Sequence, residues 1–314
     1  MDDERTSSHG PRPGFVHEAL MYRDVAEFDG AMHAFLQEAA TAGEPVLVAL
    51  PGPHLKHAQQ ALGEAMADAR CEDLQEVGRN PSCLLEMIEQ WVASHDGRAR
   101  VVSEVVWPGR SHAESVEALR HEALVNHALA GSEATVMSPF DAAQLDADIL
   151  AAVEMTHPTV VEDGRRRAGT AYTDPLSTTF GELWPLDEPV GPVSEHPLTG
   201  SLLELRRAIA SDPALASLSA ARRSDLVLAI NEATSNAVRH GNATCMTRIW
   251  HDGDEVVTEV CTPSAIADVM VGRRRPAADA LEGRGLWLIN QVCDLVELRS
   301  GTSGMTLRMH VRDH

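Results

Sequence analysis

The residues with the clearest chemical potential lie in the second half of the chain. Glu232, Asn236 and His240 are spaced four apart in residues 224–240, where the apolar residues follow a helical period. This spacing places the three side chains along one stripe of a helix. A carboxylate and a carboxamide one turn apart can hold Mg²⁺, which prefers oxygen ligands and is usually bound with substrate phosphates. Taken alone, the same spacing also fits a solvated polar face.

A second motif lies further along the chain. Gly283-Arg284-Gly285-Leu286 opens the apolar pattern of residues 286–294, which we predict to be helical. Glycines in a turn that begins a helix leave backbone N–H groups free, and these groups together with the helix dipole attract phosphate. The second motif therefore favours a site for a phosphorylated ligand.

The sequence around these motifs predicts helices followed by pairs of strands that form β-hairpins. Apolar residues with a helical period give way to short β-branched runs separated by turn residues. The predicted helices are 198–211, 224–240 and 286–294, and the predicted strands are 245–250, 255–261, 295–300 and 304–311.

The charge of the chain is uneven. Of its 314 residues, 26 are Lys or Arg and 47 are Asp or Glu, which gives a net charge of −21. Residues 1–163 carry 10 basic and 28 acidic side chains, and residues 164–314 carry 16 and 19. A strongly negative surface disfavours direct binding to nucleic acid or to an anionic membrane. The change in charge near residue 163 indicates that two different domains meet there.

The apolar runs and the cysteines of the sequence indicate where in the cell the protein is located. No apolar run approaches the roughly 18 residues that a membrane span requires, and the N-terminus is polar. Five cysteines without a C-x-x-C pair are typical of reduced thiols. We therefore expect a cytoplasmic protein with no membrane partner.

The first half alternates short apolar strands with helical patterns. The predicted strands are 45–50, 100–107 and 134–137, and the predicted helices are 25–40, 54–69, 82–91, 115–130 and 142–155. This alternation predicts a mainly parallel α/β sheet that is covered on both faces. The loop after residue 50 has a single glycine and a lysine in the wrong place for a phosphate loop, so we predict no nucleotide site there.

Residues 15–163 resemble the MEDS sensory domain of bacterial regulators. The resemblance rests on His17, Tyr22, Glu27-Phe28, Gly43-Glu44, Ser103-Glu104, Trp107, the segment 122–126 and His157-Pro158. It implies a ligand or signal sensor with a RecA-like or KaiC-like layout.

Two segments lie outside the predicted domains. Residues 1–14 are predicted to be a disordered tail. Residues 164–197 are rich in Pro, Gly, Ser and Thr and are predicted to be a linker.

Residues 198–314 resemble the GHKL ATPase domain, in the branch of the anti-sigma-factor serine kinases. The family motif E-x-x-x-N-A followed by H is met by Glu232, Asn236 and His240, and the family motif G-x-G-L by residues 283–286. The resemblance implies an α+β sandwich with ATP between the helices and a lid, Mg²⁺ on Asn236, and a polarising or general-base role for Glu232. It assigns nucleotide binding to Asn236, His240, Thr262, Gly283, Arg284, Gly285 and Leu286.

Two further expectations concern the nucleotide. The arginines at positions 273–275 fall in the lid, where they could contact phosphates or form a solvated loop. The family has an Asp followed by x-G between the two motifs, and its carboxylate accepts a hydrogen bond from adenine; here Thr262 stands at that position and the glycine is missing. A hydroxyl is a weaker acceptor than a carboxylate, so we expect weakened ATP binding.

These observations predict a bacterial signalling regulator. The leading hypothesis is an anti-sigma-factor-like serine/threonine protein kinase controlled by its sensory domain. Its partners would be a sigma factor or a small antagonist protein of the STAS type, and related kinases suggest a homodimer. One alternative is a catalytically degenerate GHKL module that sequesters partner proteins. Another is a protein related to sensor histidine kinases, although no long helix with a phosphoacceptor histidine precedes residue 198.

Overall fold

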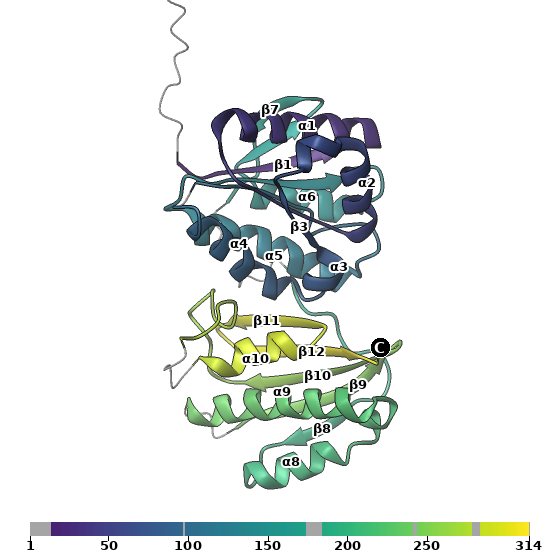
Figure 1. Ribbon diagram of the computed structural model, residues 1–314. Coiled ribbons are helices and arrows are strands. Elements are labelled where there is room, and N and C mark those ends of the chain that lie inside the picture. Colours follow the sequence, from purple (N-terminus) through teal and green to yellow (C-terminus); the bar gives the residue numbers. More distant parts are fainter. Residues whose placement is uncertain (1–13, 97, 174–183, 241–243, 278–282, 314) are drawn as a thin grey trace, which may run out of the picture.

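Two β-sheets, each backed by helices, form the two halves of the chain (Figure 1). The computed structural model describes residues 14–96, 98–173, 184–240, 244–277 and 283–313. The predicted tail at residues 1–14 lies outside the described residues except for Gly14. No helix in the described part of the chain has the length and apolar character needed to cross a membrane.

The first sheet has seven strands in the order β3-β2-β4-β5-β1-β6-β7, and every neighbouring pair is parallel except β6 with β7. The mainly parallel sheet predicted from the sequence is therefore confirmed. The strands are β1 (Val16–Tyr22), β2 (Val46–Leu50), β3 (Arg70–Asp73), β4 (Arg100–Ser103), β5 (Thr135–Asp141), β6 (Thr159–Glu162) and β7 (Arg165–Ala168). The sequence pattern predicted β2, β4 and β5, but it missed β1, which lies between β5 and β6 in the sheet.

Helices cover both faces of this sheet. Helices α1 (Val25–Ala42) and α2 (Gly52–Leu62) pack on one face, where Leu20 and Met32 share a core. Helices α4 (Leu84–Ala93), α5 (His112–Leu129) and α6 (Ala147–Thr156) pack on the other face. The connecting turns are η1 (Gly63–Met66), α3 (Leu74–Val77) and η2 (Pro81–Cys83).

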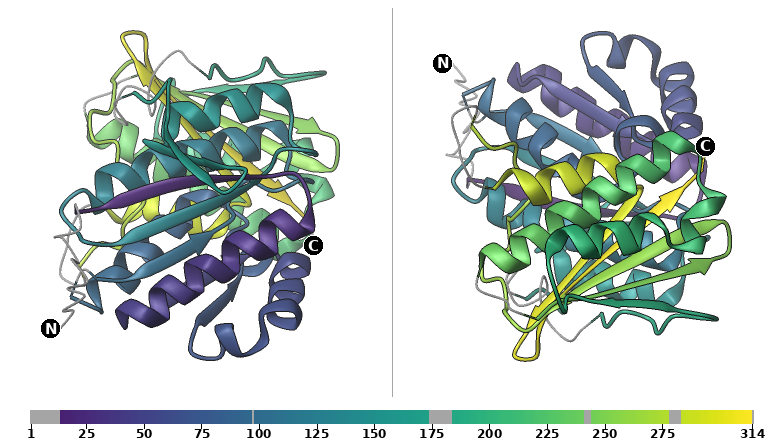
Figure 2. Two further views of the ribbon diagram at one scale, coloured as in Figure 1. Left: turned by 90° about the horizontal axis from the view of Figure 1, so that it is seen from above. Right: turned by 90° about the horizontal axis from the view of Figure 1, so that it is seen from below.

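The second sheet has five antiparallel strands in the order β11-β12-β10-β9-β8. The strands are β8 (Ser194–Pro197), β9 (Met246–Asp252), β10 (Glu255–Thr262), β11 (Leu295–Gly301) and β12 (Gly304–Arg312). Helices α8 (Leu202–Ala210), α9 (Ala220–Arg239) and α10 (Arg284–Val292), with the turn η3 (Pro213–Ser217), lie on one face, as the right-hand view of Figure 2 shows. This arrangement is the predicted α+β sandwich.

Two boundaries differ from the prediction. Helix α9 begins after Ser219, whose hydroxyl accepts a hydrogen bond from the Arg222 N–H group, whereas Ser224 lies inside the helix and donates to the carbonyl of Ala220. The segment 164–197, predicted as a linker, starts with β7 and ends with β8. Each of these short strands extends the sheet of the neighbouring domain.

The two domains meet where α4 and α5 face α10 and β11 (Figure 1). Glu117 of α5 is fully buried, and its carboxylate lies 2.5 Å from a guanidinium nitrogen of Arg120 and 2.5 Å from one of Arg299 on β11. Arg273 lies 3.7 Å from the same carboxylate. Burial alone would raise the pKa of Glu117, but the three guanidinium groups hold this pKa below its usual range. One carboxylate thus joins both domains.

Replacing Glu117 with glutamine should destabilise the folded chain. The variant leaves three guanidinium groups without their carboxylate, and removing one partner of a buried ion pair costs about 3–5 kcal/mol. We expect urea denaturation to give a free energy of unfolding lower by about that amount. Glu133→Gln is the matched control, because Glu133 forms an exposed pair with Arg98 and such pairs contribute about 0–1 kcal/mol. Equal stability of the two variants would contradict this assignment.

The pH dependence of stability in wild type and Glu117→Gln gives a second test. Because the pKa of Glu117 is lowered in the folded state, its contribution is fully present above the pKa of the unfolded carboxyl group and is lost as the pH falls through the folded pKa. The difference in unfolding free energy between wild type and Glu117→Gln should therefore shrink on acidification. A difference that grows at low pH would show that Glu117 is not held ionised.

Candidate functional site

A pocket of about 490 Å³ opens between α9, the start of α10 and the loop after β10. Five of the predicted site residues line this pocket: Asn236, His240, Thr262, Gly283 and Leu286. Apolar side chains, among them Ile266, Val271, Met305 and Leu307, form much of the remaining wall. The volume and the mixture of apolar walls with a few polar groups are those of a small-molecule site.

The two sequence motifs touch each other beside this pocket. A Cβ atom placed on Gly285 would lie 2.5 Å from Asn236 Nδ2 and 3.1 Å from Glu232 Oε2. Glycine at position 285 lets the start of α10 approach the polar stripe of α9 closely. Gly283 precedes α10 with φ +86°, and no side chain of a described residue caps the helix.

Two of the predicted residues take other positions. Glu232 is not in the pocket wall and lies beside Gly285 at the junction of α9 and α10. Arg284 is exposed and donates a hydrogen bond to the Ala277 carbonyl at 3.4 Å.

Sequence reasoning missed two charged residues of the pocket. Arg239 lines it and donates a hydrogen bond to Asn236 Oδ1 at 2.9 Å, so the oxygen proposed for Mg²⁺ already contacts a cation. The spacing of three between these residues was a usable signal. Asp268 brings a carboxylate to the loop side and accepts a hydrogen bond from the Met270 N–H group. No motif marks Asp268, because it lies in an irregular loop.

Thr262 lies at the end of β10 and is buried in the pocket wall. Its hydroxyl donates to the carbonyl of Ser264 at 3.3 Å. The hydroxyl is therefore engaged with its own loop, and it is a weak acceptor compared with a carboxylate.

The three arginines of the loop do not line the pocket. The sequence leaves two alternatives for them, contacts with phosphates or a solvated loop, and neither describes Arg273. Arg273 is buried near Glu117. Arg274 donates to Glu89 of α4 at 2.8 Å, and the guanidinium of Arg275 lies 5.5 Å from the centre of the Trp287 ring. Arg273 and Arg274 are attracted to carboxylates of the acidic first domain. These contacts between domains cannot be predicted from the local sequence.

Apolar and neutral contacts fix the same loop. Met270 is buried in a core cluster of the first domain that includes Leu47, Leu85 and Ile88. Asn290 of α10 donates to the Gly272 carbonyl at 2.9 Å, and Asn80 donates to the Asn290 carbonyl at 3.0 Å. The loop that closes the pocket is therefore packed against the first domain.

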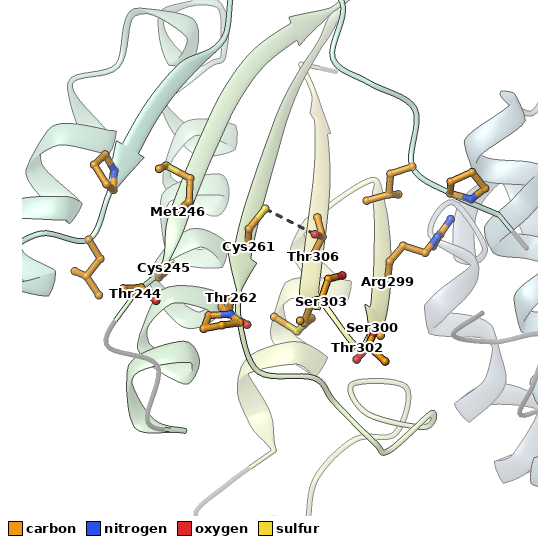
Figure 3. A pocket seen from close by; sticks show the side chains of 18 of the residues that line it. Thr244, Cys245, Met246, Cys261, Thr262, Arg299, Ser300, Thr302, Ser303 and Thr306 are labelled. Carbon is orange, nitrogen blue, oxygen red and sulfur yellow. Dashed lines mark hydrogen bonds between the residues drawn. The ribbon is translucent and has the colours of Figure 1, made fainter. Parts of the chain in front are cut away.

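A larger groove of about 790 Å³ crosses the opposite face of the second sheet (Figure 3). Met246, Cys261 and Thr306 point into it, and residues 184–186 form one side. Arg299, at the side of the groove next to the first domain, is already paired with Glu117. Thr262 is the only predicted site residue in this groove, so the smaller pocket remains the candidate site.

The first domain gathers polar side chains where parallel strands end. Tyr22, the last residue of β1, donates to Glu104 Oε1 at 2.8 Å, and His54 Nδ1 lies 2.7 Å from Glu104 Oε2. Burial raises the pKa of both Tyr22 and Glu104, and the hydrogen bond to Glu104 raises the pKa of His54. This edge is where α/β sheets bind ligands, and Tyr22 and Glu104 belong to the motif pieces noted in the sequence.

Comparison with protein families agrees with this division. Residues 16–158 match the family model described as the MEthanogen/methylotroph, DcmR Sensory domain, or MEDS, and residues 197–311 match the histidine kinase-like ATPase domain. No curated protein matches the chain. The protein thus consists of a MEDS domain followed by a histidine kinase-like ATPase domain, the architecture of a signalling regulator.

Proposed function

We propose that the MEDS domain controls an ATP-dependent serine/threonine protein kinase of the anti-sigma-factor type through the loop that closes the nucleotide pocket. The observation that carries this proposal is the attachment of residues 269–274 to the sensory domain by Met270, Arg273 and Arg274. A signal that alters the sensory domain would change how this loop is held, and hence how the pocket accepts ATP.

The chemistry of the pocket supports a nucleotide. The start of α10 reaches the pocket through Gly283 and Leu286, where the helix dipole favours phosphate, and Arg239 adds a positive charge at the same pocket. The close approach of Gly285 to Asn236 and Glu232 provides the compact junction that the GHKL motif requires.

Mg²⁺ fits the oxygen donors of this junction. Asn236 would hold the ion after its Oδ1 atom releases Arg239, and the released guanidinium would be free to neutralise phosphate charge. Bound Mg²⁺ supplies charge neutralisation during phosphoryl transfer, which depends mainly on placement and electrostatics. Glu232 would polarise the attacking hydroxyl group or accept its proton.

The protein substrate remains a proposal by analogy with the anti-sigma-factor kinases. It would be a serine or threonine on a STAS-type antagonist, a sigma factor would be the sequestered partner, and the protein would act as a homodimer. A second candidate function is sequestration without ATP turnover. Thr262 favours it, because the resemblance to the GHKL family places a carboxylate at this position and the Thr262 hydroxyl is bonded to Ser264.

Calorimetric titration with Mg-ATP tests the pocket. We expect wild type to bind weakly, Thr262→Asp to bind roughly 10- to 100-fold more tightly because a charged acceptor is restored, and Asn236→Ala to lose binding. Gly285→Ala should also lose binding, since its Cβ would overlap Asn236. Gly301→Ala is the matched control, because a Cβ there meets no atom within 4 Å. No binding by wild type or Thr262→Asp at millimolar ATP would favour sequestration.

The control of the loop has its own test. Glu89→Gln removes the ion pair with Arg274, which is half exposed, and exposed pairs contribute about 0–1 kcal/mol. Releasing the loop should allow it to close over ATP, so we expect about 2- to 5-fold tighter binding in the same calorimetric titration. Glu133→Gln should leave the affinity unchanged. An unchanged affinity in Glu89→Gln, with wild type binding ATP, would refute control through this loop.

A further inference from the structure

Two histidines and a glutamate converge in the interior of the MEDS domain. His17 of β1, Glu122 of α5 and His157, directly after α6, each offer a ligand atom, and these atoms lie within 4.8 Å of one another. All three side chains are fully buried, with exposed fractions of 0–1%. Neither the nucleotide pocket nor the polar edge around Glu104 includes them.

The hydrogen bonds of the two rings determine which nitrogen faces the cluster. His17 Nδ1 lies 3.0 Å from Asn126 Oδ1, and the Asn126 amide is oriented by donating to the Thr156 carbonyl at 2.7 Å. His157 Nδ1 lies 3.0 Å from the Val153 carbonyl, which can only accept. Both Nδ1 atoms thus have partners outside the cluster, and each ring turns Nε2 toward Glu122.

This arrangement brings three electron-pair donors together. His17 Nε2 and His157 Nε2 lie 3.1 and 3.5 Å from the same oxygen of Glu122, Oε2. His157 Nε2 and Glu122 Oε1 have no hydrogen-bond partner within the described ranges. Buried polar atoms without a partner are rare in folded proteins, so the three converging ligand atoms favour a bound ion between them.

The two distances to Glu122 Oε2 suit a tetrahedral metal ion. Zinc lies about 2.0–2.2 Å from histidine nitrogen and carboxylate oxygen, so neighbouring ligands in a tetrahedron are about 3.3 Å apart. Both Nδ1 atoms have the outer hydrogen-bond partners that metal-bound histidines almost always have. Ser138 Oγ, at 2.9 Å from Glu122 Oε2 and 3.3 Å from His17 Nε2, is an oxygen near a fourth position. The Phe140 ring packs against His157 and keeps the site dry.

We propose that His17, Glu122 and His157 bind a divalent transition metal ion of the zinc class inside the MEDS domain. The ion would join β1, α5 and the C-terminal end of α6. Glu122 follows Glu117 by five residues on α5, about 7.5 Å along the helix axis. The metal site and the carboxylate at the domain interface are thus attached to one rigid helix.

The test uses the purified full-length chain without a polyhistidine tag. After chelator treatment, competition with a chromophoric chelator should show tight uptake of one equivalent of Zn²⁺, and Zn²⁺ should raise the melting temperature. Co²⁺ should give the intense visible absorption of a tetrahedral site. If the untreated and chelator-treated wild-type proteins both fail to take up Zn²⁺ and Co²⁺, the cluster holds a proton and the proposal is wrong.

Variants identify the ligands. His157→Ala should weaken Zn²⁺ binding by more than about 100-fold, and Asn126→Ala, which removes an outer partner, by about 10- to 100-fold. His127→Ala is the matched control, because His127 lies exposed on the same helix. Uptake by folded His157→Ala equal to that of wild type would overturn the assignment. Should His157→Ala fail to fold, the Co²⁺ spectrum of wild type and the affinity of Asn126→Ala still decide the question.

Discussion

The buried carboxylate of Glu117 is the contact on which the arrangement of the two domains depends. It accepts from Arg120 on its own helix and from Arg299 on the second sheet, and it attracts Arg273 in the loop of the nucleotide pocket. Two buried guanidinium groups and the partly buried one of Arg299 around a missing carboxylate would be far more costly than the intact cluster. Any movement of α5 must therefore carry the second domain with it or break this cluster.

This contact helps to explain why the arginine-rich loop after β10 lies against the first domain rather than over the pocket. Three consecutive arginines in the loop before the glycine turn at residues 283–286 would be expected to contact the phosphates of a ligand at that turn. Instead, the excess negative charge of the first domain places Glu117 and Glu89 opposite Arg273 and Arg274. Met270 adds apolar burial in the same direction. The loop that forms one wall of the candidate pocket is therefore packed against the first domain. This contact is the physical basis for proposing that the first domain controls the second.

Much of the second domain could be predicted from its sequence, because its signals are local. The four-residue spacing of Glu232 and Asn236 and the turn at Gly283 lie within single elements, and the structure brings Asn236 and Gly283 to one pocket. The hairpin strands β9, β10, β11 and β12 were predicted within about two residues for the same reason. Ser219 was missed as the helix cap because Ser224, further along, offers an equally good local pattern.

The parts that sequence reasoning missed depend on distant partners. In strand β1 the polar residues His17 and Glu18 follow directly after the first residue, so the segment does not look like a buried strand. Both are buried because they pair with Glu122 and Arg166, which lie over 100 residues away in the sequence. The edge strands β7 and β8 are short and polar, so only their pairing defines them. The role of Arg273 could not be predicted either, since its partner lies in the other domain.

The central claim is that the sensory domain holds the loop of the nucleotide pocket in place. Hydrogen exchange of the wild-type protein, measured by mass spectrometry over residues 266–277, tests it most directly. The Met270 N–H group is bonded to Asp268 and the Arg273 N–H group to the Met270 carbonyl. The account predicts that both amides exchange slowly, at rates comparable with those of α4, against which the loop packs. Exchange as fast as in an unstructured peptide would mean that the loop is free and that the sensory domain does not hold it.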